Sequence, residues 1–197
     1  MRWSSSASGL RTKGRIQLAE TVLVIGIGGL GVHAVQLAKA LGARVIAVDI
    51  TEDRLAGATR YGADAVIDGS QEDVPARVRE LTGGEGADVA VEIVRGEAVP
   101  GVIQHALAAL APGGRLVVMG YAYGRSLSVY TAALAYGQWR LLGTRASAKQ
   151  DLADVIRLVE SGVITPVVAR TFPIEAAAGA FESLRRDPPL GRIVLRS

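Results

Sequence analysis

The chain has 197 residues, 49% of them hydrophobic and 21% charged, which allows one compact unit with a small appendage and excludes a wholly disordered protein. It contains no cysteine, so disulfides and thiolate sites are excluded, and no apolar run reaches the roughly 20 residues of a membrane span. The net charge is +3, but four basic residues precede the first acid, Glu20, which leaves 18 basic residues against 19 acidic ones. This distribution argues against nucleic-acid binding.

Residues 1–19 form a basic leader that is rich in serine. The leader lacks the apolar core of a secretory signal, and an organellar transit peptide is the alternative to an ordinary chain terminus. We expect a poorly ordered terminus and a cytoplasmic protein.

From residue 21 onward, short β-branched runs alternate with segments of helical period, as in βαβ units. The expected strands are residues 21–25, 44–49, 65–67, 89–93, 115–119 and 140–144. The expected helices are residues 30–41, 52–61, 74–81, 98–110 and 148–161. This pattern predicts an α/β fold, a doubly wound parallel six-stranded sheet of the Rossmann type with helices on both faces, over residues 20–161.

The rhythm changes after residue 161, and residues 162–197 form a short C-terminal tail. It has apolar residues at 166–169 and 172–174, a helical pattern over 175–184, a Pro188-Pro189 break and an apolar closing strand at 192–195. This tail does not continue the βαβ alternation.

A glycine-rich loop follows the first expected strand and opens a helix. Gly26 permits a tight turn, Gly28 lets a backbone approach a pyrophosphate without a Cβ in the way, and Gly31 allows close helix packing. The amides of Gly29 and Leu30 would then point at the phosphates, together with the helix dipole. A single motif of this kind is weak evidence, but the strand before it and the helix after it are the required context.

The second expected strand ends at Asp49, 18 residues after Gly31. A carboxylate there accepts hydrogen bonds from both hydroxyls of an adenosine ribose and repels a 2′-phosphate, so NAD is favoured over NADP. The alternative role, capping the next helix, is better filled by Thr51.

Other nucleotide-binding families fit less well. A triphosphatase loop needs Lys and Ser or Thr after its glycines, where this chain has Val32-His33. Short-chain dehydrogenases pair a Tyr with a Lys four residues later, and neither Tyr121 nor Tyr136 has one. A methyltransferase would share the glycine loop but normally carries an acid near Val24.

Together these segments resemble the coenzyme-binding part of the medium-chain, zinc-type alcohol dehydrogenase family over residues 20–196, about nine-tenths of the chain. Beyond the glycine loop and Asp49, the matching motifs are Tyr61-Gly62-Ala63-Asp64, Gly83-Gly84-Glu85-Gly86-Ala87-Asp88-Val89, Leu110-Ala111-Pro112-Gly113-Gly114-Arg115 and Gly191-Arg192-Ile193-Val194-Leu195.

The resemblance implies a set of cofactor-binding residues, namely Gly26, Gly28, Gly29, Leu30, Gly31, Asp49, Arg54, Ile93, Val94, Gly120, Tyr121 and Arg192. Within it, Arg54 would lie beside the adenine and its ribose. Ile93 and Val94 would flank the nicotinamide, and backbone groups of Gly120 and Tyr121 would contact its carboxamide. By the same carry-over, Arg192 would approach the pyrophosphate.

The chain also departs from the family. There, Cys and His residues of a preceding barrel domain bind the catalytic zinc, whereas this sequence has no Cys and only His33 and His105, so we expect no zinc site and nominate no catalytic residue. Arg95 stands where the family more often has Gly. The tail would pack on the barrel, so it should expose apolar surface for a second subunit or a separately encoded catalytic domain. Family dimers form through the sheet edge, near residues 141–144.

The sequence therefore predicts the NAD(H)-binding domain of an alcohol dehydrogenase-like oxidoreductase, which would transfer hydride between an alcohol or aldehyde and nicotinamide. We expect this chain to bind NAD(H) but to turn over no alcohol alone. The alternatives are a non-catalytic dinucleotide-binding or dimerisation module and, ranked last, a methyltransferase that uses S-adenosylmethionine.

Overall fold

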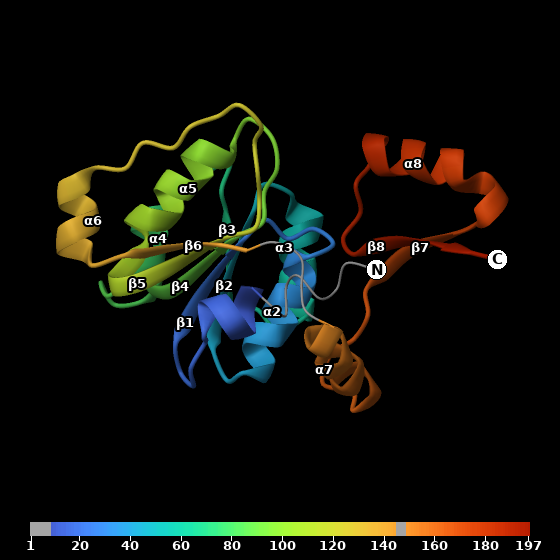
Figure 1. The fold of residues 1–197 in the computed structure, drawn as a ribbon, viewed down its shortest axis with the longest axis horizontal. Coiled ribbons are helices and arrows are strands. Elements are labelled where there is room, and N and C mark those ends of the chain that lie inside the picture. The colour runs from blue at the N-terminus through green and yellow to red at the C-terminus, as the bar shows by residue number, and fades with distance from the viewer. Residues whose placement is uncertain (1–8, 145–148) are drawn as a thin grey trace.

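The computed structural model describes residues 9–144 and 149–197 and contains a six-stranded parallel sheet (Figure 1). Its strands run in the order β3-β2-β1-β4-β5-β6. Their bounds are β1 (Thr21–Ile25), β2 (Arg44–Asp49), β3 (Ala65–Asp68), β4 (Ala87–Glu92), β5 (Leu110–Val118) and β6 (Arg140–Gly143). The predicted doubly wound fold is confirmed, with the order reversing between β1 and β4.

Helices cover both faces of this sheet. Their bounds are α2 (Gly31–Ala40), α3 (Glu52–Arg60), α4 (Val74–Leu81), α5 (Val99–Ala108) and α7 (Lys149–Glu160). One core cluster joins α2, α3 and α7 to one face of the sheet, and a second joins α4 and α5 to the other. Strand residues alternate between the two clusters, with Val22 and Val24 of β1 in the first and Leu23 and Ile25 in the second. Burial on both faces explains why the strands are continuous apolar runs.

Two segments differ from the sequence prediction. Strand β5 begins at Leu110, which was expected to end a helix, because Leu110 pairs with Ala87 before an irregular stretch at Gly113, whose φ is +76°. A short helix, α6 (Thr131–Gly137), was not predicted; it has no buried residue, and so the apolar periodicity of a core-facing helix is missing.

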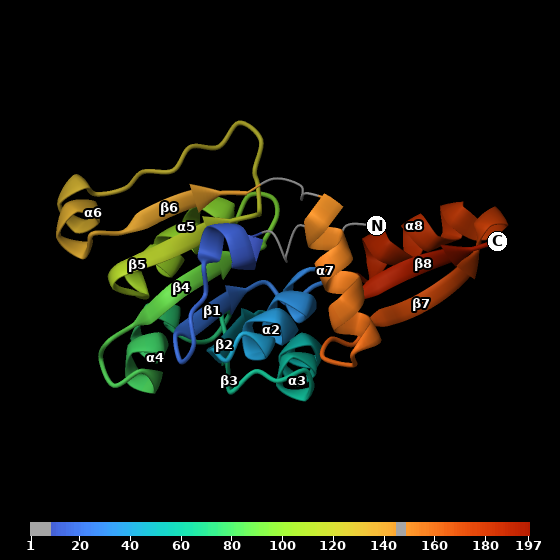
Figure 2. The same cartoon turned by 60° about the horizontal axis from the view of Figure 1, so that its bottom comes forward.

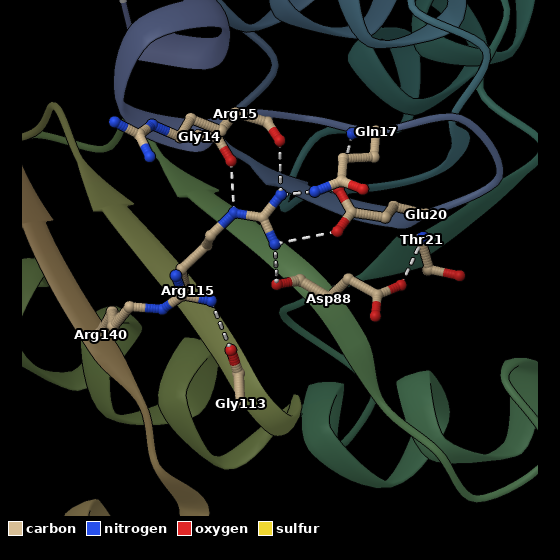
Figure 3. Close-up of polar contacts among 9 residues, drawn as sticks. All are labelled: Gly14, Arg15, Gln17, Glu20, Thr21, Asp88, Gly113, Arg115 and Arg140. Atoms are coloured by element: carbon tan, nitrogen blue, oxygen red, sulfur yellow. Dashed lines mark hydrogen bonds and ion pairs between the residues drawn. The ribbon is translucent and has the colours of Figure 1, made fainter.

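The N-terminal residues in the described part of the chain pack against the amino ends of the strands. A π-helical turn, η1 (Gly9–Gly14), places Leu10 in the core, where it is 1% exposed. Arg115 of β5 then donates hydrogen bonds to the carbonyl oxygens of Gly14 and Arg15 and to both carboxylate oxygens of Glu20 (Figure 3). Of the leader expected to be poorly ordered, residues 1–8 lie outside the described residues.

A cleft of about 510 Å³ opens at these amino ends, lined by Arg115 and Glu20 among others. All three guanidinium nitrogens of Arg115 are already hydrogen-bonded within the chain. Burial alone would raise the pKa of Glu20, but the hydrogen bond and charge of Arg115 hold it below its ordinary value. The cleft therefore surrounds charged groups that already pair within the chain, here called the amino-edge anchor. It lies at the amino ends of the strands, whereas the glycine loop lies at their carboxyl ends.

The C-terminal unit stands beside the sheet domain (Figures 1 and 2). It consists of β7 (Val168–Pro173), the 3-10 turn η2 (Ile174–Ala176), α8 (Ala177–Arg186) and β8 (Arg192–Arg196). Strands β7 and β8 form a separate parallel pair, and β7 was not predicted as a strand. Among the described residues, no helix is both long and apolar enough to cross a membrane.

Candidate functional site

The glycine loop, residues 26–31, leaves β1 at the carboxyl edge of the sheet. Gly26 has a φ of +95°, which favours glycine, and a Cβ added to Gly31 would overlap the carbonyl oxygen of Gly26. These two glycines are therefore required by the loop itself. A Cβ added to Gly28, in contrast, would have no atom of the described residues within 4 Å. Nothing in the described fold requires glycine at position 28.

Backbone donors border the open space at Gly28. The N–H groups of Gly28 and Gly29 donate no hydrogen bond within the described residues, whereas the carbonyl oxygen of Gly28 accepts from Val32 in the first turn of α2. Helix α2 begins at Gly31, so the partial positive charge of its amino end lies on the same side as these donors. The loop thus offers an anion both hydrogen-bond donors and a favourable field.

Asp49 ends the neighbouring strand β2 and is 5% exposed. One carboxylate oxygen accepts from the amide of Ile27 at 2.7 Å, and the other accepts from the amides of Ile50 at 2.8 Å and Thr51 at 3.2 Å. Thr51 occupies the N-cap position of α3, as the sequence predicts, but within the described residues its side chain makes no capping hydrogen bond, and Asp49 accepts from the amides that precede the helix. Asp49 thus ties the glycine loop to the start of α3.

Arg54 lies beside this carboxylate. One of its nitrogens is 3.6 Å from an oxygen of Asp49, and another donates to the carbonyl oxygen of Pro188 at 2.8 Å. The arginine therefore joins the end of β2 to the chain that leads into β8.

The third part of the site lies where β4 and β5 end. The backbone of Ile93 and the side chain of Val94 would touch a Cβ on Gly26, at 3.3 and 3.1 Å. The next loop reaches the same place through a bridge between Arg95 and Tyr121, whose ring lies 5.7 Å from the guanidinium carbon. The predicted residues that follow β4 and β5 are thus adjacent to the glycine loop or to each other.

Glu92, which is fully buried, connects these two loops. Its carboxylate oxygens accept from the amides of Val94 at 2.6 Å and Gly120 at 3.1 Å. Burial raises the pKa of Glu92, and these two hydrogen bonds oppose that rise. The carboxylate sets the relative position of the two loop backbones.

The C-terminal unit completes the site from the other side. A Cβ added to Gly29 would lie 2.5 Å from the carbonyl oxygen of Gly191 and 3.0 Å from two side-chain atoms of Arg192. Gly29 is therefore required by the approach of the tail to the loop. Gly29 and Gly191, 162 positions apart in sequence, meet here, and Arg192 lies next to the glycine loop.

Two buried residues of α2 that the sequence did not assign to the site also contact the tail. His33 is 4% exposed and lies between Gly29 and Val167, and Gln36 is 8% exposed and bonds to Thr165. Their helical spacing and apolar neighbours gave no sign of this, because the partners lie 129 and 134 residues away. Only the contact of the tail with α2 identifies them.

No metal site is formed by the part of the chain that the structure describes. It contains no group of three or more His, Cys, Asp or Glu side chains that could hold an ion. His33 uses both ring nitrogens in contacts with the backbone, and His105 is exposed on α5. These residues do not fit a catalytic zinc ion.

Comparisons with known proteins agree with this geometry. A family model described as zinc-binding dehydrogenase matches residues 29–161. The NAD-dependent alcohol dehydrogenase of Sulfurisphaera tokodaii is 32% identical over 185 residues, which are 93% of this chain and 52% of that protein. An acryloyl-coenzyme A reductase of the same organism is 30% identical over 193 residues, 95% of this chain and 54% of that protein.

Solved structures show the same relation. The alcohol dehydrogenase of Aeropyrum pernix superposes with a TM-score of 0.87 at 29% identity, covering 98% of this chain and 55% of that one. The chain thus spans about half the length of the curated relatives it matches.

Proposed function

The chain belongs to the zinc-binding dehydrogenase family, and from that premise we propose that it binds NAD(H) as the coenzyme-binding part of an alcohol dehydrogenase-like oxidoreductase. The S. tokodaii relative is named for NAD dependence and alcohol oxidation, which supports this cofactor and reaction class. A second relative is named as an acryloyl-coenzyme A reductase, so the proposal is limited to the cofactor and to hydride transfer.

One observation carries the proposal, which is the contrast among the glycines of the loop. Gly26 and Gly31 are required by the loop and Gly29 by the tail, but a Cβ on Gly28 would enter open space beside backbone donors. A pyrophosphate placed there would accept from the amides of Gly28 and Gly29. Glycine at position 28 is then explained by the ligand.

Asp49 supports NAD over NADP. Its carboxylate lies beside the loop, and the oxygen that accepts from the amide of Ile27 alone keeps a second lone pair for a ribose hydroxyl, whereas the other oxygen already accepts from Ile50 and Thr51. A 2′-phosphate would meet this buried negative charge, which Arg54 compensates from only one side.

The nicotinamide, when bound, supplies the hydride chemistry, and this chain supplies orientation. Ile93 and Val94 would form an apolar edge for the ring. The carbonyl oxygen of Gly120 and the backbone of Tyr121 would face its carboxamide, because the amide of Gly120 already donates to Glu92. Glu92 fixes both loops at this end through the amides of Val94 and Gly120. The groups that act on the substrate would come from a catalytic domain.

The C-terminal unit would dock that domain. It exposes a set of large apolar side chains, namely Val168, Ile174, Phe181, Leu184 and Leu195. Phe181 is 66% exposed, which is costly unless a partner covers it. A separately encoded catalytic domain, or one continuous with this chain, would bury this face.

The outer edge of β6 would carry a homodimer contact. Among the described strands, β6 pairs with β5 alone, so its other edge has unpaired backbone groups. Leu141 on β6, together with Tyr130, Leu134 and Tyr136 around α6, exposes apolar surface near this edge. A second copy would continue the sheet there.

The test is calorimetric titration of NADH into wild type and into Gly28→Val. For wild type we expect a dissociation constant in the micromolar range, which corresponds to a binding free energy on the order of −8 kcal/mol. For the variant we expect at least a 100-fold loss of NADH affinity with an unchanged melting temperature. Gly101→Val is the matched control, because Gly101 also has open space around its Cβ position but lies on α5. Absence of NADH binding to wild type, or equal binding by Gly28→Val, would refute the proposed function.

A further inference from the structure

We propose that His33 and Gln36 of α2 are positioning residues that hold the tail so that Arg192 stays aligned with the pyrophosphate-binding loop. The inference rests on the proposed function. It adds that contacts from α2 position the C-terminal segment that supplies Arg192 to the site. Residues 165–167, which lead into β7, are the segment that these two side chains grip, and they are called the tail strap below.

His33 connects the glycine loop to the tail strap through both ring nitrogens. Its Nδ1 lies 3.0 Å from the carbonyl oxygen of Gly29, and its Nε2 lies 3.2 Å from the amide nitrogen of Val167. Because the amide of Val167 must donate, Nε2 is the acceptor and Nδ1 carries the proton that Gly29 accepts. A neutral imidazole with this one tautomer therefore satisfies both ends.

The environment of His33 keeps it neutral. Burial lowers the pKa of His33 to about 4, with a further lowering by the nearby charge of Arg192, although the bond to Gly29 opposes the shift. The ring thus remains able to accept from Val167 across the neutral range of pH.

Gln36 lies one helical turn later on the same face of α2 and makes a second, reciprocal contact. Its Nε2 donates to the carbonyl oxygen of Thr165 at 3.1 Å, and its Oε1 accepts from the amide of Thr165 at 2.7 Å. A side-chain amide in this arrangement replaces the pairing that a neighbouring β-strand would give. Together, His33 and Gln36 fix both ends of the tail strap.

The tail strap in turn positions the residues around Arg192. The carbonyl oxygen of Val167 accepts from the amide of Arg192 at 2.9 Å, and a Cβ on Gly191 would overlap that same oxygen. Gly191 has a φ of +92°, so glycine is favoured both by its conformation and by this close approach. The path therefore runs from α2 through Val167 to Gly191 and Arg192, and ends against Gly29.

The first two turns of α2 therefore have two roles. The amino end of α2 offers its dipole to the pyrophosphate, and side chains from its first two turns set the place of the arginine opposite. Loss of these contacts would remove the restraint that α2 places on Val167, and through it on the backbone of Arg192. Its contribution to cofactor affinity would then fall, because a guanidinium that must be ordered on binding costs side-chain entropy.

The experiment is a double-mutant cycle on NADH affinity. Arg192→Ala is measured in the wild-type background and again in the Gln36→Ala and His33→Ala backgrounds, with Gln104→Ala as the control background. Gln104 makes a similar bond from a helix to a loop carbonyl, that of Ser128, but lies on α5 across the sheet. We expect Arg192→Ala to weaken NADH about tenfold in wild type and Gln104→Ala, and less than threefold in the two α2 variants.

Two further readouts separate positioning from loss of folding. Binding of adenosine, which has no pyrophosphate, should change less than twofold in any background. Hydrogen exchange at the amides of Val167 and Arg192 should accelerate at least tenfold in His33→Ala while amides of β1 keep their protection.

The outcomes are distinct. If wild type does not bind NADH, the proposed function and this inference both fail. If wild type binds NADH but Arg192→Ala costs the same in all backgrounds, or costs nothing in wild type, the proposed function stands and the positioning role is refuted. Either α2 variant alone suffices for the decision, should the other not fold.

Discussion

Charged side chains have different partners at the two ends of the parallel strands, here called the amino edge and the carboxyl edge of the sheet. At the amino edge, Arg115 and Glu20 satisfy each other and the backbone of Gly14 and Arg15 (Figure 3). At the carboxyl edge, Asp49 and Glu92 accept hydrogen bonds from backbone amides, Arg54 lies 3.6 Å from Asp49, and the amides of Gly28 and Gly29 make no bond within the described residues. Charged side chains that line a cleft can thus be fully paired within the chain and indicate no ligand. Backbone donors that have no acceptor within the described residues and lie beside open space do indicate one.

Removal of the amino-edge anchor should have the largest effect on stability. Arg115→Ala leaves the carboxylate of Glu20, 18% exposed, without its charged partner and three carbonyl oxygens without the donor that Arg115 supplies. We expect a loss of about 3 kcal/mol in the free energy of unfolding. Chemical denaturation measures it, and NADH affinity should stay within twofold. A parallel loss of cofactor affinity would show that the two edges are not independent.

The pH dependence of stability should report His33. Because burial lowers the pKa of His33 to about 4, below the ordinary 6.5, the unfolded chain binds more protons between these values. Stability is then full above about pH 6.5 and falls by about 3 kcal/mol as the pH decreases to about 4. Urea denaturation of wild type and His33→Gln over this range measures the difference. Identical profiles would show that His33 is not held neutral in the folded chain and would contradict its assigned contact with Val167.

The choice between dinucleotides should depend on the charge of Asp49. Asp49→Asn keeps the size of the side chain and one carbonyl oxygen for Ile50 and Thr51. We expect the ratio of NADPH to NADH affinity to rise about tenfold, since repulsion of the 2′-phosphate is lost. Competition titrations measure this ratio, and the same substitution at Asp73, the N-cap of α4, is the control. An unchanged ratio would place the ribose elsewhere.

The smallest effect is expected for the ion pair between Arg125 and Glu97, which joins the loops after β4 and β5 at the surface. Its side chains are 54% and 77% exposed, so solvent screens the attraction. Glu97→Gln should change the free energy of unfolding by no more than about 0.5 kcal/mol. A change above 1 kcal/mol in the free energy of unfolding, measured by thermal unfolding, would mean that this pair fixes the two loops, a role that we assign to Glu92.

Local signals predicted most of the fold. The glycine loop, Asp49 at the end of β2 and the six strands follow from short apolar runs and their breaks, because a parallel strand buried on both faces has a distinctive composition. The sequence also predicted that the tail exposes apolar side chains, and Phe181 does so.

Contacts between distant segments could not be predicted in this way. His33 and Gln36 have the pattern of buried helix residues, and only the tail strap gives them polar partners. Likewise, Arg115 resembles an ordinary strand-end residue until Gly14 and Glu20 surround it. Helix α6 lacks a buried face, and β7 is half exposed, so neither produces a clear periodicity.

The most direct test of the comparison between the two edges is a titration of isotope-labelled protein with NADH, followed by amide chemical shifts. The account predicts large shifts for Gly28, Gly29 and Ile27 at the carboxyl edge, and none for Gly14, Arg15 or Arg115 at the amino edge. Shifts confined to the amino edge, or no shifts at millimolar NADH, would contradict it.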